Sequence, residues 1–162
     1  MIKIIAYTEN YNQEAVDIWN EVVCDGIAFP QDSPLKYAEG EAFFKGQTYT
    51  GLAMDENNKI VGLYILHPNN VGRCGHICNA SYAVKKSERG KGIGEILVRD
   101  CLKEAKAHNY KILQFNAVVA TNTVALNLYK KLGFTPLGVI KNGFRVSDNT
   151  YLDIIPHYIE LK

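Results

Sequence analysis

Residues 89–94, with the sequence Arg-Gly-Lys-Gly-Ile-Gly, place the strongest constraint on the fold of this chain. They have a glycine at every second position and are followed at once by an apolar pattern typical of a helix. Glycine adopts left-handed backbone conformations and allows the backbone to approach a ligand closely. The amides of a helix's first turn have no intrahelical acceptor, so they are available to an anion. The segment therefore predicts a loop that leads into a helix and binds a ligand with several negative charges, such as a pyrophosphate.

The overall charge of the chain requires that such an anion site be local. The 162 residues carry a net charge of +1, with 22% charged and 47% apolar residues, which is an ordinary globular composition. No general positive field therefore favours a nucleic-acid partner, and we expect none. The length suits a hydrophobic core of one domain, and we expect a single domain over residues 1–162.

Leader, membrane and metal-site patterns are weak in this sequence. The first residues read as a short strand, and no apolar run approaches the ~20 residues of a membrane span. We therefore expect a cytoplasmic protein with reduced thiols and no membrane partner. The segment Cys74-Gly75-His76-Ile77-Cys78 carries two thiols and an imidazole, but no second Cys/His pair follows at a spacing that would complete a zinc site. We expect no bound metal.

Hydrophobic periodicity predicts a mixed order of helices and strands. Apolar residues at helical spacing, such as Ile18, Trp19 and Val22, mark the first helix. The expected helices cover residues 11–26, 35–45, 92–108 and 121–132, and the expected strands cover residues 2–7, 48–55, 59–67, 76–84, 111–119, 134–140 and 151–161. Asn122 can cap the start of the fourth helix, and Gly133 follows its end. This order predicts a layered α/β structure with helices on both faces of a sheet.

The glycine spacing differs from that of two common phosphate-binding loops. Gly90-x-Gly92-x-Gly94 is not the G-x-G-x-x-G of a dinucleotide fold, and it lacks the Lys-Ser/Thr ending of a P-loop. A nucleotide-binding regulatory domain is therefore disfavoured. Taken alone, the segment could also be a flexible turn with solvated cations.

Two motifs together resemble the GNAT superfamily of N-acetyltransferases. Residues 82–94 are similar to the acetyl-coenzyme A signature of that family, whose pattern R/Q-x-x-G-x-G/A is filled by Arg89, Gly92 and Gly94. Residues 122–134 resemble its second motif, N-x-x-A-x-x-x-Y-x-x-x-G-F. The resemblance covers essentially the whole chain and implies an α/β fold with a mixed, mainly antiparallel central sheet of about seven strands, flanked by about four helices.

The resemblance implies acetyl-coenzyme A as co-substrate and assigns roles within both motifs. The loop amides would bind the pyrophosphate, and the strand before the loop would pair with the pantetheine arm. An amide near Val84 would bind the thioester oxygen as charge builds on it. Tyr129 would act as general acid toward the leaving thiolate, with helix packing as the alternative role. The coenzyme-binding residues implied are Ala83, Val84, Arg89, Gly90, Lys91, Gly92, Ile93, Gly94, Asn122 and Tyr129.

Acetyl transfer also requires a neutral amine as nucleophile. Deprotonating a lysine-like amine at pH 7 takes roughly 4–5 kcal/mol, whereas an α-amine takes only about 1–1.4 kcal/mol. His76 is the expected catalytic base, because histidine is the side chain best suited to exchange a proton near neutral pH and this one lies on the strand that enters the site. Glu21 and Asp25 on the first helix are alternative bases, and His76 could instead be structural.

Polar residues inside apolar strands mark the expected acceptor side. Buried amides need hydrogen-bond partners, so Asn79 and Asn116 are expected either to bind the acceptor or to pair within the protein. Their strands, at 76–84 and 111–119, match the strands that splay apart in GNAT proteins. Residues 76–79, together with Phe115 and Asn116, are also similar, more loosely, to a branch that acts on small amino acids and proline analogues.

The predicted function is direct transfer of acetyl to a primary or secondary amine of a small molecule, such as an amino acid or analogue. No cysteine lies in a recognisable nucleophile motif, so an acetyl-enzyme is not expected. The alternatives are a protein or peptide N-acetyltransferase and a coenzyme A-binding module without activity. The aromatic residues 151–158 would line the acceptor side, contact a second copy in a homodimer, or form a plain final strand. The acceptor, the base and the use of longer acyl donors stay open.

Overall fold

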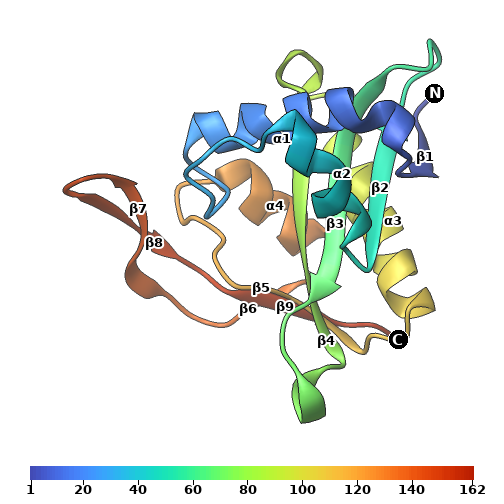
Figure 1. Ribbon diagram of the computed structural model, residues 1–162. Coiled ribbons are helices and arrows are strands. Elements are labelled where there is room, and N and C mark those ends of the chain that lie inside the picture. Colours follow the sequence, from blue (N-terminus) through green and yellow to red (C-terminus); the bar gives the residue numbers. More distant parts are fainter.

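A seven-stranded sheet forms the body of the protein, whose computed structural model describes residues 1–162 (Figure 1). Its strands are Lys3–Ala6 (β1), Tyr49–Met54 (β2), Ile60–Pro68 (β3), Ile77–Val84 (β4), Ile112–Phe115 (β5), Thr135–Pro136 (β6) and His157–Glu160 (β9). They lie in the order β1-β2-β3-β4-β5-β9-β6, and only β4 and β5 pair in parallel. The four α-helices are Asn12–Asp25 (α1), Tyr37–Lys45 (α2), Ile93–Ala107 (α3) and Thr123–Lys131 (α4). The expected mixed, mainly antiparallel sheet with four helices is confirmed.

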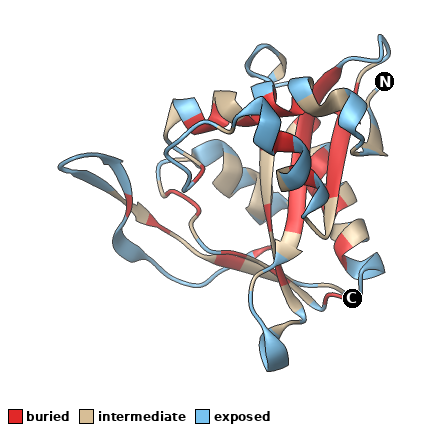
Figure 2. Cartoon of the chain, in the orientation of Figure 1, coloured by how far each residue is buried: buried red, intermediate tan, exposed pale blue.

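The helices cover both faces of the sheet (Figure 1). Side chains alternate along β3, so that Leu63 and Ile65 join the core beneath α1 and α2, whereas Tyr64 and Leu66 join the core beneath α3 and α4. Figure 2 shows β2 and β3 as almost continuously buried strands between these layers. No helix combines the length and apolar character that crossing a bilayer requires.

β4 and β5 separate soon after they meet. They pair only at Ile77 with Ile112 and at Cys78 with Leu113. The strand expected at 111–119 is wrong in its length, because β5 ends at Phe115 and Val119 forms an isolated bridge to Ile154 instead. From residue 79 onward, β4 therefore has no strand paired with it on its β5 side. We call this break in the backbone pairing between β4 and β5 the opening.

The end of the chain contains a hairpin that the sequence pattern did not predict. Residues 134–140 and 151–161 were expected as a closing pair of strands, but β6 and β9 are short, and a separate hairpin of Ile140–Ser147 (β7) and Thr150–Ile154 (β8) lies between them. The hairpin projects from the body of the molecule (Figures 1 and 2). Phe144 is the only buried residue of β7. The segment therefore lacks the alternation that identifies a half-buried strand in sequence.

Candidate functional site

The glycine loop connects β4 to α3 through a short 3-10 turn, Lys86–Glu88 (η3). Gly90 and Gly92 have φ angles of +81° and +80°, a region in which any residue with a Cβ is strained. A Cβ at either position would meet no atom within 4 Å, so the constraint is conformational rather than steric. Gly94 differs, because it has no positive φ and its Cβ would lie 3.8 Å from Leu128, an ordinary contact. Two of the three glycines are therefore required by the backbone.

The amides of residues 90–95 form an unpaired row along this loop and the first turn of α3. No backbone group of the chain accepts a hydrogen bond from them, and no side chain caps the helix. Gly92 is the residue immediately before α3, so this row ends in the positive pole of the helix dipole. Unpaired amides at a helix start suit a polyanion such as a pyrophosphate.

The two cations of the loop are already paired with carboxylates. Nη1 of Arg89 donates to Oδ2 of Asp25 at 2.7 Å, and Nε of Arg89 donates to the carbonyl oxygen of Val84 at 3.2 Å. Lys91 lies 2.7 Å from Glu88. Both cations were expected to face the ligand, but their charges are partly balanced by these partners. The backbone amides are therefore the principal free donors of the loop.

Backbone direction along β4 determines which groups face the opening. The amide of Lys85 donates to Val61, and the carbonyl of Ile77 accepts from Asn69, so odd-numbered residues of β4 direct their backbone groups toward β3. Backbone groups alternate sides along a strand. Those of residues 82 and 84 consequently point into the opening. Val84 thus fits the predicted strand contact, whereas Ala83 is paired in register with Leu63 and does not present its backbone to the opening.

Tyr129 lies on α4 within an aromatic group that reaches across the opening. Its ring centroid is 4.5 Å from that of Phe115 on β5, and Phe115 lies 5.8 Å from Tyr82 on β4. Burial raises the pKa of Tyr129 well above its usual value, so the phenol keeps its proton at neutral pH. The hydroxyl oxygen of Tyr82 is buried and has no hydrogen-bond partner. The structure therefore brings Tyr129 to the same opening as β4.

Asn79 and Asn116 are brought together by a residue that sequence reasoning missed. Asn69, which follows β3, accepts from Asn116 at 2.7 Å and from Asn79 at 3.5 Å, and donates to Asn116 at 3.2 Å. Gln114 also donates to Asn116, at 3.1 Å. Since Leu113 of β5 is buried beneath α3 and α4, its neighbours on β5 face the opposite side of the sheet. The amide group Asn69, Asn79, Gln114 and Asn116 therefore lies on the sheet face that carries α1.

His76 lies at the opposite end of β4 from the glycine loop. It is exposed and precedes the first residue of the strand. At about 3.3 Å per residue, it lies roughly 25 Å along the strand from Val84. This distance argues against the expected role of His76 as a base at the opening, because proton transfer requires hydrogen-bond reach or one intervening water.

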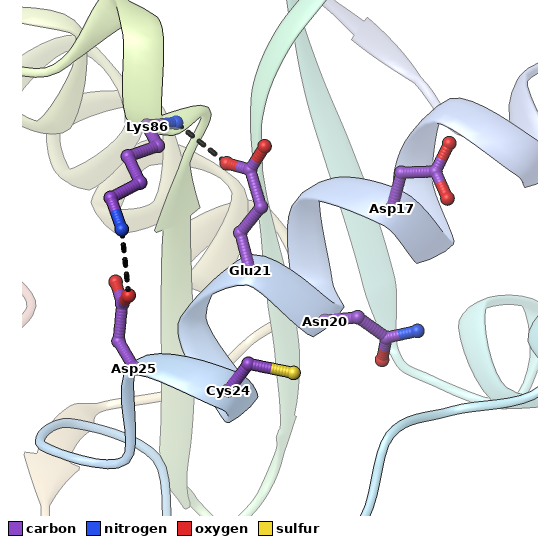
Figure 3. Close-up of a pocket in the computed structure, with 6 residues that line it drawn as sticks. All are labelled: Asp17, Asn20, Glu21, Cys24, Asp25 and Lys86. Atoms are coloured by element: carbon purple, nitrogen blue, oxygen red, sulfur yellow. Dashed lines mark hydrogen bonds and ion pairs between the residues drawn. The ribbon is translucent and has the colours of Figure 1, made fainter.

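Glu21 and Asp25, the alternative bases, are engaged in structural contacts. Together with other polar residues they line a hollow beside α1 (Figure 3), whose lining consists of Asp17, Asn20, Glu21, Cys24, Asp25 and Lys86. Glu21 accepts a hydrogen bond from the backbone amide of Lys86 at 2.6 Å. The hydrogen bond from Arg89 lowers the pKa of Asp25. Both carboxylates therefore stabilise the segment that leads into the glycine loop. Neither of them is free to accept a proton from an amine.

Comparison with known proteins decides between the classes that such a loop and opening allow. Residues 7–134 match the acetyltransferase (GNAT) family, a span that includes both motifs. The chain belongs to the GNAT family. It is 37% identical over 102 residues to N-acetyltransferase aca1 of Schizosaccharomyces pombe, covering 62% of this chain and 49% of that protein. It is 33% identical over 82 residues to the N-alpha-acetyltransferase of Sulfurisphaera tokodaii, covering 51% of this chain and 48% of that protein. The chain thus spans about half the length of these curated relatives.

Solved structures support the GNAT fold along the whole chain. A GCN5-related N-acetyltransferase from Kribbella flavida superposes with a TM-score of 0.90 at 26% identity, covering 99% of this chain and 98% of that one. A phosphinothricin acetyltransferase of the GNAT superfamily from Sinorhizobium meliloti, in complex with AcCoA, also gives a TM-score of 0.90 and covers 99% of this chain and 88% of that one. Its identity of 19% supports the fold alone.

His157 is a second residue that the sequence motifs did not single out in this GNAT chain. It is buried on β9, in register with Phe115, and its ring lies 5.9 Å from that of Tyr129. Nδ1 lies 2.6 Å from the carbonyl oxygen of Ile155, so this nitrogen carries a proton. His157, and not His76, is therefore the histidine beside Tyr129. Only the pairing of β5 with β9 could have placed it there.

No group of three or more histidine, cysteine, aspartate or glutamate side chains is arranged to hold a metal ion. All four cysteines are free, and Cys78 and Cys101 are buried. The CxxxC-type pair, Cys74 and Cys78, is divided between an exposed turn and a buried strand.

Proposed function

We propose that this GNAT protein is an N-acetyltransferase, folded as one domain over residues 1–162, that moves acetyl from acetyl-coenzyme A directly to a small-molecule amine. The observation that carries the proposal is the row of free amides at residues 90–95, which follows the unpaired edge of β4 in the same connection. The names of the relatives in Schizosaccharomyces pombe and Sulfurisphaera tokodaii support the same reaction class.

In this proposal the coenzyme binds through the backbone more than through side-chain charge. The amides of residues 90–95 would bind the pyrophosphate, where each hydrogen bond to a charged group contributes about 1.5–3 kcal/mol. The helix dipole adds only about 0.3–1 kcal/mol. The pantetheine arm would lie against the free edge at residues 82 and 84, in the manner of an added strand. The amide of Val84 would donate to the thioester oxygen as negative charge develops on it.

The proposed chemistry is a direct exchange of the C–S bond for a C–N bond. The lone pair of the acceptor amine attacks the thioester carbonyl, and the bond to sulfur breaks as the amide forms. Tyr129 donates a hydrogen bond or its proton to the leaving thiolate. A thiol has a pKa near 8.5, and the raised pKa of Tyr129 makes full proton transfer less favourable than hydrogen bonding. The proton that the attacking amine loses passes to the thiolate, or to Tyr129 where that residue has already given its own proton to the thiolate.

The polar groups on the acceptor side favour an amine of low pKa. Asn69, Asn79, Gln114 and Asn116 all carry amides, which cannot accept a proton at neutral pH. An α-amine needs only about 1–1.4 kcal/mol to become neutral at pH 7, compared with roughly 4–5 kcal/mol for a lysine-like amine. We therefore infer that the acceptor is a free amino acid or analogue that reacts at its α-amine.

A peptide amino terminus is the second candidate acceptor. It carries an α-amine with the same advantage in pKa, and the similarity to the N-alpha-acetyltransferase of Sulfurisphaera tokodaii favours it specifically. Free amino acids and short peptides therefore belong in the same acceptor screen.

Calorimetry and a thiol-release assay test the proposal together. Acetyl-coenzyme A should bind at micromolar concentration, and no binding at high micromolar ligand would overturn the assignment. In the thiol-release screen at pH 7, α-amino compounds should be turned over faster than polyamines or aminoglycosides. Binding without thiol release from any amine would identify a coenzyme A-binding module instead.

A further inference from the structure

The carboxyl-terminal turn of α1 is joined to the start of the glycine loop, although the two are distant in sequence. Oδ2 of Asp25 lies 2.7 Å from Nη1 of Arg89, and Oδ1 of Asp25 lies 3.5 Å from Nζ of Lys86. Glu21, one turn earlier on α1, accepts from the backbone amide of Lys86 at 2.6 Å. Figure 3 shows both carboxylates reaching from α1 toward Lys86. Side-chain and backbone donors of the β4–α3 connection thus converge on one helix end.

Arg89 carries this connection on to β4. Its Nε donates to the carbonyl oxygen of Val84, the last residue of β4, while another guanidinium nitrogen pairs with Asp25. The side chain of Asp25 is 21% exposed and that of Arg89 39%, so the pair is partly shielded from water. The backbone of Arg89 leads directly into Gly90, where the row of free amides begins. Holding the Arg89 side chain at two points therefore restrains the entrance to that row.

We propose that Asp25 is a positioning residue for the glycine loop, which acts through Arg89 to hold the amides of residues 90–95 in their binding conformation. The inference rests on the proposed binding of coenzyme A at this loop. Through this contact α1, which lies on the acceptor side of the sheet, would restrain the loop that binds the coenzyme. Asp25 itself touches no ligand in this role.

The opposite role for Asp25 is physically distinct and testable. A guanidinium has five N–H donors, so Arg89 keeps free donors that could reach a pyrophosphate. If Arg89 served mainly as a ligand, Asp25 would compete with the coenzyme for its charge, and removing the carboxylate would tighten binding. If Arg89 serves mainly as a support, removing the carboxylate weakens binding.

The test compares Asp25→Asn with Asp17→Asn in the full chain. The first change keeps the side-chain shape but removes the ion pair. Since a partly exposed pair contributes about 0.2–1 kcal/mol, the Kd for coenzyme A by calorimetry should rise about 1.4- to 5-fold. KM for acetyl-coenzyme A should rise by the same factor, with kcat unchanged within about two-fold. Asp17 lies on the same helix and pairs with Tyr37, away from the loop, so its variant should bind as the wild type does.

A double-mutant cycle separates positioning through Arg89 from a general loss of structure. If Asp25 acts through Arg89, the Asp25→Asn change should add no further loss of affinity in an Arg89→Gln background. Additive losses, unchanged affinity or tighter binding of Asp25→Asn would each overturn the inference. Absence of coenzyme A binding by the wild type would instead overturn the proposed function, so the two failures are distinguishable.

Discussion

The three glycines of the loop do not share one structural requirement, although they alternate regularly in sequence. Gly92 precedes α3 with a φ of +80°, and Gly94 lies inside the helix with space for a Cβ beside Leu128. A left-handed conformation raises the free energy of a residue with a Cβ by roughly 1–2 kcal/mol. Lys91, by contrast, is exposed and already paired with Glu88. Backbone conformation, and not the lysine charge, should therefore determine affinity at this loop.

We expect Gly92→Ala to weaken coenzyme A binding by roughly 5- to 30-fold, which corresponds to the 1–2 kcal/mol of backbone strain. Lys91→Ala should change the Kd by less than about three-fold, as expected for an exposed charge. Gly94→Ala is the matched control and should bind as the wild type does. Calorimetry on the three variants measures the order, and an equal or reversed effect of Lys91→Ala would indicate that side-chain charge makes the site.

Tyr129 combines aromatic packing with the proposed contact to the leaving group. Tyr129→Phe keeps the ring beside Phe115 and removes only the hydroxyl. We expect kcat to fall about 10- to 150-fold, the range for loss of a hydrogen bond of about 1.5–3 kcal/mol to the developing thiolate, with little change in the affinity for coenzyme A. A kcat close to that of the wild type, measured by thiol release, would show that Tyr129 is only a packing residue.

At the scale of the element, α4 depends on a cap that lies within the second motif. The side chain of Asn122 accepts a hydrogen bond from the amide of Ala125 at 3.2 Å, and Gly133 follows the helix with a φ of +87°. Both helix ends were predicted from sequence and are confirmed. Because α4 carries Tyr129, the cap also supports the position of the catalytic candidate.

Replacing the capping residue should lower stability by a measurable amount. We expect Asn122→Ala to reduce the free energy of unfolding by about 1 kcal/mol, or Tm by about 2–4 °C for a chain of this length. Asn122→Asp should retain the cap and most of the stability. Asn127→Ala, an exposed substitution within the same helix, serves as control and should cause no loss. Thermal unfolding in the absence of ligand makes the comparison, and equal Tm values for Asn122→Ala and Asn127→Ala would contradict the role of the cap.

At the scale of the whole molecule, Tyr64 is buried in the core under α3 and α4, and Tyr82 and Tyr129 pack against that core. Burial raises the pKa of Tyr64, Tyr82 and Tyr129 well above the usual value near 10. Tyr64 also donates a hydrogen bond to Asp100 at 2.7 Å, which further favours its protonated form. In the unfolded chain these phenols would ionise near pH 10. The folded state therefore holds protons that the unfolded state has lost above this pH.

Stability should consequently fall as the pH rises above 10. Below that pH both states keep the phenol protons, so this contribution is fully present; above it, each buried tyrosine lowers the free energy of unfolding by about 1.4 kcal/mol per pH unit. Denaturant unfolding between pH 9 and 11.5 measures the slope. Tyr129→Phe should reduce the slope by the contribution of one tyrosine, about 1.4 kcal/mol per pH unit. Tyr151→Phe, at an exposed position, should leave the slope unchanged. Identical slopes for the two variants would refute the buried-phenol explanation.

The sequence predicted helices and strands well where local signals were strong. It predicted them poorly where pairing between distant segments decided whether a strand forms and where it ends. Apolar periodicity identified α1 and α3 to within about one residue at each end. The length of β5 and the β7–β8 hairpin were missed, because an exposed hairpin has no alternating pattern and a strand ends wherever its neighbour departs. The catalytic base stays a prediction, because the sequence does not show that His76 lies at the end of β4 opposite the glycine loop.

What the sequence determined by itself is the local conformation of the two motifs. Gly90 and Gly92 permit the left-handed backbone found there, and Asn122 caps α4, because these properties depend only on a residue and its nearest neighbours. Tertiary structure alone decided that Arg89 pairs with Asp25 and that His157 lies beside Tyr129. Such contacts join segments distant in the chain, and their geometry follows from how the sheet brings helices and strands together. No spacing within a single motif can encode that placement.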